Sequence, residues 1–197
     1  MDVSIIPIYT SEPLGTIRAR DGEDYNIHIG LDRLQVQELK EKSLDDSDTE
    51  LQQNTSDRKR FGEGSYEDWY SKERTPYSLL SRDGALAAIA WFGPKPIGRK
   101  SLKYLSEEEL AKELQQPKSD WHTIVYRAYQ PYRGKGLMVN FVRFVMDDYR
   151  KRHPDAKLWA GVNTKNQASM ALAVKLGFKQ SEEHQDEEVG WGVMIEQ

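Results

Sequence analysis

The chain has 197 residues with 38% hydrophobic and 30% charged residues, which is enough for one domain with a substantial core. Five Trp and ten Tyr argue against a disordered chain, and the net charge of −4 provides no global basic field that would recruit nucleic acid. Cysteine is absent, which excludes disulfides, thiolate metal sites and a cysteine nucleophile.

The chain shows neither a basic amino-terminal segment followed by an apolar run nor a stretch approaching the roughly 18 apolar residues of a spanning helix. The four His are scattered, without the spacing of metal ligands. We therefore expect a cytoplasmic protein without a metal, and partners that include neither membrane nor nucleic acid.

The first 76 residues predict few regular elements. Their apolar patterns favour short strands at 5–9 and 25–29 and an amphipathic helix at 31–39. The polar segment 43–60 is expected to be an exposed, mobile loop, and its Arg58-Lys59-Arg60 run is interpreted as a solvated patch rather than a nucleic-acid site. Beyond that segment, Ser65 is expected to cap a short helix.

The second part of the chain has stronger signals. Asp83-Gly84 between two apolar runs is typical of a β-hairpin. The remaining patterns predict, in order, helix 105–114, strand 122–129, a long helix from 137 that Pro154 closes, strand 157–162, helix 166–176, and two closing strands, from 178 onward and over 189–195. This alternation indicates a mixed α/β domain.

The connection Arg133-Gly134-Lys135-Gly136-Leu137-Met138 lies between a predicted strand and the long helix. Glycine lets the backbone approach a ligand closely, and the first helical turn offers unpaired N–H groups to a phosphate. The segment matches neither a P-loop nor the GxGxxG fingerprint. The glycines alone are equally compatible with a pyrophosphate site and with an ordinary connection that exposes basic residues.

Two segments together resemble the GNAT (GCN5-related N-acetyltransferase) family. Residues 132–137 resemble its cofactor loop, Arg/Gln-x-x-Gly-x-Gly/Ala. Residues 166–178, from Asn166 to Gly177-Phe178, resemble its second motif, Asn-x-x-Ala-x-x-Leu-Tyr-x-Lys-x-Gly-Phe. The resemblance covers residues 77–195. It implies a central, mostly antiparallel twisted sheet that splays at the cofactor and has helices on both faces.

The resemblance also implies roles for individual residues. The cosubstrate would be acetyl-CoA, with the strand end near Ala128 hydrogen-bonded to its pantetheine arm. Asn166 and Ser169 would line the same arm, although Asn166 is also suited to cap a helix. The pyrophosphate would be held by backbone amides of the loop, namely those of Gly134, Lys135, Gly136, Leu137 and Met138, with added charge from Arg133.

Two positions depart from the family pattern. Met138 stands where Gly or Ala is usual, which crowds the loop but leaves its backbone donors intact. Ala173 stands where many members have a Tyr that protonates the departing thiolate, so the proton donor has to be sought elsewhere. The candidates for proton transfer are His122, Tyr126 and Tyr129 on the 122–129 strand, and each of them is also compatible with a packing role.

The acceptor site is less well defined by the sequence. Glu67, Asp68 and Tyr70 could line it, and the five carboxylates of 182–188 could form an acidic rim that steers a cationic amine. For both groups a solvated surface is the simpler interpretation. Asp120 and Glu63 are similarly ambiguous.

We expect a single domain over 1–197, with a variable acceptor-side part at 1–76 and the cofactor-binding core at 77–195. The expected function is acetyl transfer from acetyl-CoA to a primary amine of a small metabolite, a polyamine, a peptide amino terminus or a lysine. The alternatives are a CoA-binding module without catalysis and an interaction domain. Dimers are common in the family, which leaves a homodimer open.

Overall fold

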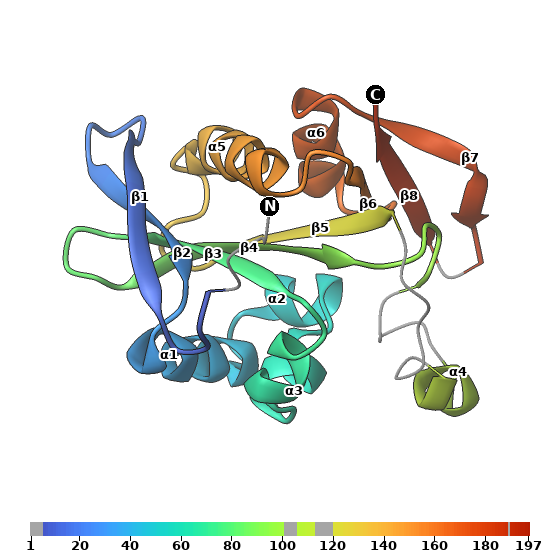
Figure 1. Cartoon of the computed structure of the whole chain (residues 1–197), viewed down its shortest axis with the longest axis horizontal. Coiled ribbons are helices and arrows are strands. Elements are labelled where there is room, and N and C mark those ends of the chain that lie inside the picture. The colour runs from blue at the N-terminus through green and yellow to red at the C-terminus, as the bar shows by residue number, and fades with distance from the viewer. Residues whose placement is uncertain (1–5, 101–105, 113–119, 189) are drawn as a thin grey trace.

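The computed structural model describes residues 6–100, 106–112, 120–188 and 190–197. An eight-stranded sheet in the order β1-β2-β3-β4-β5-β6-β8-β7 runs through the molecule (Figure 1). All neighbours are antiparallel except β5 and β6, which are parallel. The strands are β1 (Ser11–Arg18), β2 (Asp24–Gly30), β3 (Thr75–Leu80), β4 (Leu86–Pro94), β5 (Trp121–Ala128), β6 (Lys157–Asn163), β7 (Phe178–Asp186) and β8 (Trp191–Glu196).

Helices cover both faces of this sheet (Figure 1). One face carries α5 (Leu137–Arg152) and α6 (Gln167–Lys175). The opposite face carries α1 (Arg33–Leu44), α2 (Thr49–Asn54), the short π-helical turn η1 (Arg58–Gly62) and α3 (Tyr66–Tyr70). The short helix α4 (Glu107–Lys112) lies apart from both groups. The mixed α/β fold with a mostly antiparallel sheet is as predicted.

The hydrophobic core has two parts, one on each face of the sheet. In α5 the apolar side chains recur at helical spacing, and Phe141, Val145 and Tyr149 are fully buried against the sheet. On the other face Phe61, Trp69 and Trp91 pack edge to face. Both cores meet the strongly apolar strand β4, which anchors its neighbour β5.

The parallel pair β5 and β6 separates along its length. Only Trp121, His122 and Thr123 pair with β6, whereas β5 stays paired with β4 up to Ala128. The remainder of β5 therefore has an open edge toward β6. We call this opening the splay; the resemblance predicts it at the cofactor.

Several predicted elements need correction at the amino-terminal end. In the expected strand 5–9, residues 6 and 7 have no regular structure, residues 8 and 9 form a turn, and residue 5 lies outside the described residues. The first strand is β1 instead. The loop expected over 43–60 contains α2 and part of η1. Leu51 and Asp57 in this segment are buried, because they pack under the sheet.

The later predictions also differ in detail. Helix 105–114 is described only over 106–112, so its two ends lie outside the described residues. Most of the acidic segment 182–188 belongs to β7 rather than to a loop. Residue 189 of the last predicted strand is not described. Within the described ranges, no helix is long and apolar enough to span a membrane.

Candidate active site

A cavity of about 610 Å³ opens at the splay between β5 and β6. The residues that the sequence assigns to the cofactor all line it, together with Tyr126. His122 and Tyr129 are not among its lining residues. The residues that the resemblance assigns to the cofactor, and that the cavity brings together, are Ala128, Arg133, Gly134, Lys135, Gly136, Leu137, Met138, Asn166 and Ser169.

The glycine loop presents the free end of α5 to this cavity. Gly134 and Gly136 have φ of 80° and 76°, a region that residues with a Cβ rarely adopt. Gly136 is the N-cap residue of α5, and no side chain caps the helix. The first amides of α5 therefore keep their hydrogen-bonding capacity, at the positive end of a 16-residue helix. This geometry suits a phosphate group.

The basic side chains around the loop are fixed by carboxylates. Arg133 forms a bidentate ion pair with Asp48, with both N–O distances at 2.7 Å. Lys135 pairs with Asp21 at 3.0 Å. Arg133 therefore connects the loop to the N-cap of α2, where the Asp48 side chain also accepts from the Leu51 N–H. The positive charge of Arg133 contributes to the electrostatic field at the loop, while its guanidinium is hydrogen-bonded to Asp48.

Arg20 is a cavity residue that the sequence analysis missed. It lines the cavity, and its side chain passes so close to Gly136 that a Cβ there would lie 2.6 Å from Nε. A backbone hydrogen bond of 3.1 Å from the Arg20 N–H to the Lys135 carbonyl holds the two segments together. Arg20 lies in the turn that follows β1, more than one hundred residues from the loop, and nothing local in the sequence signals that contact.

The open edge of β5 offers backbone groups to a ligand. The Tyr129 N–H donates to the Ala87 carbonyl at 2.9 Å. Because successive residues of a strand direct their backbone groups to opposite sides, Tyr126 and Ala128 turn theirs toward the splay. Arg127 Nη1 donates to the Tyr126 carbonyl at 2.8 Å, and Arg133 Nε donates to the Ala128 carbonyl at 2.7 Å. The two N–H groups face the cavity without a strand partner.

The opposite wall comes from α6. Asn166 caps this helix, its side chain accepting from the Ser169 N–H at 3.0 Å, so the capping interpretation applies and the residue still lines the cavity. The Tyr126 hydroxyl reaches across the splay and donates to the Ser169 carbonyl at 3.1 Å. Burial raises the pKa of Tyr126, so this phenol is protonated near neutral pH. Ala173 is buried in the core and brings no polar group to the site.

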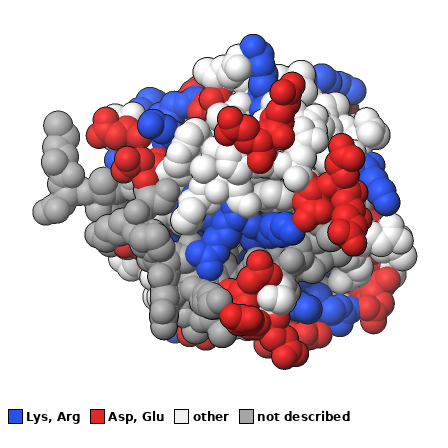
Figure 2. Space-filling view, turned by 90° about the vertical axis from the view of Figure 1, so that its right-hand side faces the viewer, with Lys and Arg blue, Asp and Glu red and all other residues white. Residues whose placement is uncertain are grey.

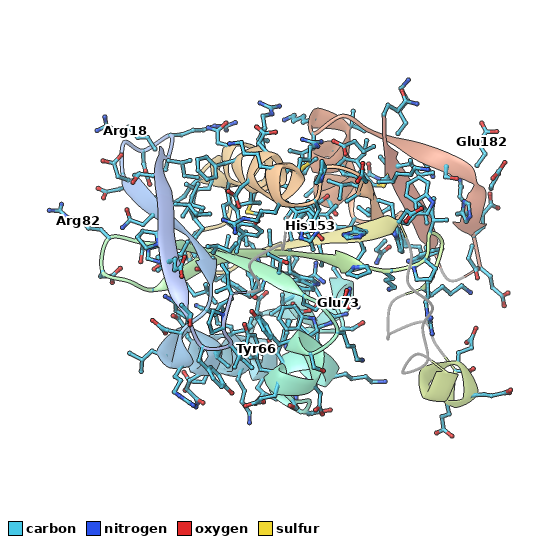
Figure 3. All side chains as sticks on the ribbon, viewed as in Figure 1. Arg18, Tyr66, Glu73, Arg82, His153 and Glu182 are labelled. Atoms are coloured by element: carbon cyan, nitrogen blue, oxygen red, sulfur yellow. The ribbon has the colours of Figure 1, made fainter. Side chains whose placement is uncertain are left out.

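His122 and Tyr129 lie in packed surroundings instead. His122 Nδ1 is 2.5 Å from the Tyr149 hydroxyl, and the ring of His153, labelled in Figure 3, packs against Tyr149 at a tilt of 30° with ring centroids 4.3 Å apart. Burial, with a smaller contribution from His153, lowers the pKa of His122 to about 4. Tyr129 is buried, and its hydroxyl has no hydrogen-bond partner in the described part of the chain. Both side chains therefore match the packing interpretation.

A buried carboxylate organises the wall on the α2 and η1 side. Asp57 is fully buried and accepts from Arg60 Nη1 at 2.7 Å and from Arg127 Nε at 3.0 Å. Both arginines line the cavity. The sequence pattern predicts a solvated patch at Arg60, which is wrong for this residue, and gives no signal for Asp57 or Arg127. Their partnership spans seventy residues, which no local pattern reveals.

The acidic candidates lie away from the main cavity. Glu182 points outward from β7 (Figure 3), and none of the carboxylates of 182–188 lines the cavity. Figure 2 shows the side of the molecule that carries β7 and β8, where Lys and Arg side chains gather centrally with acidic side chains around them. The Tyr9 hydroxyl donates a hydrogen bond to the Glu67 carboxylate, and the Tyr70 hydroxyl donates one to the Ile6 carbonyl. Among the described residues, no group of three His, Asp or Glu side chains gathers as metal ligands would.

Comparison with known proteins identifies the class. Residues 33–179 match the family described as Acetyltransferase (GNAT) domain. That match covers most of the chain, which therefore belongs to the GNAT acetyltransferase family, a class that uses acetyl-CoA. A search of curated protein sequences found no significant match.

Solved structures show the same fold at low sequence identity. The GNAT domain of S. lividans PAT is 14% identical with a TM-score of 0.61, over 96% of this chain and 98% of that one. RimL, a ribosomal L7/L12 alpha-N-protein acetyltransferase, is 16% identical with a TM-score of 0.60, over 98% of each chain. A RimL complex with coenzyme A has 16% identity and a TM-score of 0.59, over 93% of this chain and 96% of that one.

Proposed function

We propose that this chain transfers an acetyl group from acetyl-CoA to a primary amine by direct attack. The observation that carries the proposal is the cavity itself. The uncapped start of α5 and the open edge of β5 both face it, so one ligand could contact both. Acetyl-CoA combines a pyrophosphate, an amide-bearing arm and a thioester, and each of these has a matching feature along the cavity.

The residues of the chain would bind and orient this cosubstrate in three places. The amides of residues 134–138 face the phosphates, with Arg20 and Lys135 adding positive charge. The N–H groups of Tyr126 and Ala128 would face the pantetheine arm, which would lie along the open edge of β5 like an added strand. Asn166 and Ser169 form the opposite wall. Met138 also lines the cavity, with its side chain partly buried against the core.

When bound, acetyl-CoA supplies an activated acetyl group as a thioester. The amine nitrogen bonds to the carbonyl carbon, the C–S bond breaks, the amine releases a proton to water and the thiolate takes one up. A backbone N–H of β5 at the splay is placed to stabilise the charge that develops on the carbonyl oxygen. Positioning in this cavity contributes further, by several kcal/mol in favourable cases.

Tyr126 is the residue that we assign to protonate the thiolate. Its hydroxyl lies in the splay and is bonded to the backbone of α6, the helix from which the family's tyrosine would come. It is also 3.5 Å from the Ser169 hydroxyl, which connects it to a second exchangeable proton. The raised pKa of Tyr126 keeps the phenol in the donor form. A tyrosine from β5 would thus replace the one that Ala173 lacks.

The test is an acetyl-CoA turnover assay that detects thiol release with a panel of primary amines. Removal of a general acid lowers turnover by about a hundredfold or more in typical cases, so Tyr126→Phe is expected to lower kcat strongly with little change in acetyl-CoA affinity. Tyr129→Phe is the matched control, since its hydroxyl has no partner in the described structure. Unchanged kcat in Tyr126→Phe would remove the assigned role. Saturable acetyl-CoA binding without thiol release on any amine would leave a binding module.

A further inference from the structure

The lining of the main cavity is strongly cationic. Its only described acidic residue is Glu50, which lies 3.5 Å from Arg133 in an ion pair. Eight basic side chains line it as well: Arg20, Arg60, Lys95, Arg99, Arg127, Arg133, Lys135 and Lys175. Four of them pair with the carboxylates of Asp57, Asp48 or Asp21 outside the lining. Acetyl-CoA brings phosphates to one end of this cavity only, so its charge does not account for the cations at the other end.

The two ends are separated along β5. The phosphate loop follows the carboxyl end of the strand, whereas Arg60 and Lys95 accompany Thr123, where β5 and β6 meet. From Thr123 to Ala128 an extended strand spans about 17 Å. The junction of the two strands is the end of the cavity toward which a thioester would extend, so these cations lie on the acceptor side.

A smaller cavity of about 190 Å³ continues from this junction and shares Arg60, Lys95, Thr123 and Val125 with the larger one. Its charged lining is again basic, with Asp68 as the acidic member. The basic members are Lys59, Arg60, Lys72, Arg74 and Lys95. Trp69 and Trp91 supply an apolar wall. The space is large enough for a small amine with one additional group.

Several of these cations are held in place by the protein. Asp57 fixes Arg60 at 2.7 Å. The Lys95 ammonium donates to the Lys100 carbonyl at 3.2 Å and lies 5.6 Å from the centre of the Trp159 ring. Arg99 lines the large cavity and makes no ion pair within the described part of the chain. The side chains of Arg60 and Lys95 are thus held in position by the protein, with Arg99 beside them in the cavity lining.

We infer that the acceptor is a primary amine that also carries an anionic group, and that Lys95 and Arg99 bind this anion beside the thioester. The inference rests on the proposed acetyl transfer and names its acceptor class. A guanidinium and an ammonium are suited to a carboxylate or phosphate. The inference differs from the alternative in which an acidic rim at 182–188 steers a cationic amine, because those carboxylates do not line the cavity.

Two consequences follow from the same charges. A diamine would bring a second positive charge into a positive site and bind poorly. A single amine bound there would have a lowered pKa, because nearby cations disfavour the ammonium form. The site would thereby favour the neutral, nucleophilic form of the amine, so a carboxylate base would not be needed.

The test uses three amines of equal chain length: 4-aminobutyrate, butylamine and 1,4-diaminobutane. Their binding to the protein saturated with CoA is measured by calorimetry, alongside acetylation with acetyl-CoA. One charge-assisted contact corresponds to about ten- to a hundredfold in affinity, so 4-aminobutyrate is expected to bind at least tenfold more tightly than butylamine. 1,4-Diaminobutane is expected to bind most weakly. O-phosphoethanolamine tests phosphate as the anion, and the peptides Ala-Asp-Asp and Ala-Lys-Lys test whether the anion comes from a peptide.

Variants locate the effect. Lys95→Gln and Arg99→Gln are expected to remove most of the preference for the anionic amine, while Lys179→Gln, an exposed residue outside the cavity, preserves it. Equal or tighter binding of butylamine or the diamine would overturn the inference, as would the absence of anionic-amine binding up to 10 mM, a limit of about 3 kcal/mol. In either case CoA binding and acetylation of other amines would leave the proposed function standing. Failure of CoA itself to bind would refute the proposed function instead.

Discussion

The buried carboxylate of Asp57 gives the most quantitative prediction. Its side chain is 0% exposed, and its two partners, Arg60 and Arg127, are 13% and 19% exposed. Asp57→Asn keeps the shape of the side chain but removes the charge that balances two guanidinium groups. Breaking a buried ion pair on one side costs about 3–5 kcal/mol. Since both arginines keep some solvent contact, we expect a loss of about 3 kcal/mol in the free energy of unfolding.

Urea unfolding followed by tryptophan fluorescence measures this loss. With a denaturant slope of about 2–3 kcal/mol per molar, 3 kcal/mol lowers the midpoint by roughly 1–1.5 M. Asp147→Asn serves as the matched control, because its pair with Arg150 is largely exposed and should leave the midpoint unchanged. A shift in Asp57→Asn no larger than that in the control would refute the reasoning that this carboxylate stabilises the fold by balancing Arg60 and Arg127.

The other predictions concern single side chains. Tyr129→Phe is expected to leave stability unchanged or raise it by about 1 kcal/mol, since it removes a buried hydroxyl without a described partner; a loss above 1 kcal/mol in urea unfolding would reveal a missed bond. Arg133→Lys is expected to cost about 1–2 kcal/mol, because lysine cannot form the two parallel bonds to Asp48; wild-type stability of the variant would contradict this. The pKa of His122 is lowered to about 4 from about 6.5 in the unfolded chain, so the unfolded state binds the proton first and stability falls as the pH drops from about 6.5 to 4. His122→Gln should flatten that slope in unfolding curves, and an unchanged slope would contradict the assignment.

The elements around the candidate cofactor site are predictable because their signals are local. Two glycines, a following apolar helix and a capping Asn are enough to predict a loop, a free helix start and a second helix, and the structure has them over α5 and α6. The hairpin around Asp83-Gly84 is equally local, and β3 pairs with β4 there. In each case the residue types that form the element also determine where it begins or ends.

The amino-terminal part is harder to predict because tertiary contacts decide it. β1 carries Pro13 and Gly15 and little alternation, so its pairing with β2 has no sequence signature. The pattern around Ile6 and Ile8 predicts a strand, but the structure has none there. The Ile6 side chain packs against one core and the Ile8 side chain against the other. The polar segment around Leu51 becomes helical because one aliphatic side chain and Asp57 find buried partners beneath the sheet.

The same limit applies to the residues of the acceptor side. Arg127 and Asp57 are seventy positions apart, and Lys95 reaches the cavity only because β4 ends beside the start of β5. The five carboxylates of 182–188 allow a steering rim beside the simpler interpretation of a solvated surface, whereas in the fold none of them lines the cavity and Asp186 pairs with Lys100. The sign of the charge at the site therefore follows from the packing and not from the local composition.

The most direct test of the central claim is thermal unfolding with and without acetyl-CoA, for the wild type and for Gly136→Glu. The glutamate would place a side chain and a negative charge at the start of α5, at a residue with φ of 76°. A ligand at a hundredfold excess over its Kd stabilises the native state by about 2.7 kcal/mol, so the wild type should unfold at a clearly higher temperature with acetyl-CoA. The account predicts that Gly136→Glu folds and loses this shift. An unshifted wild type at millimolar acetyl-CoA, or a full shift in Gly136→Glu, would contradict it.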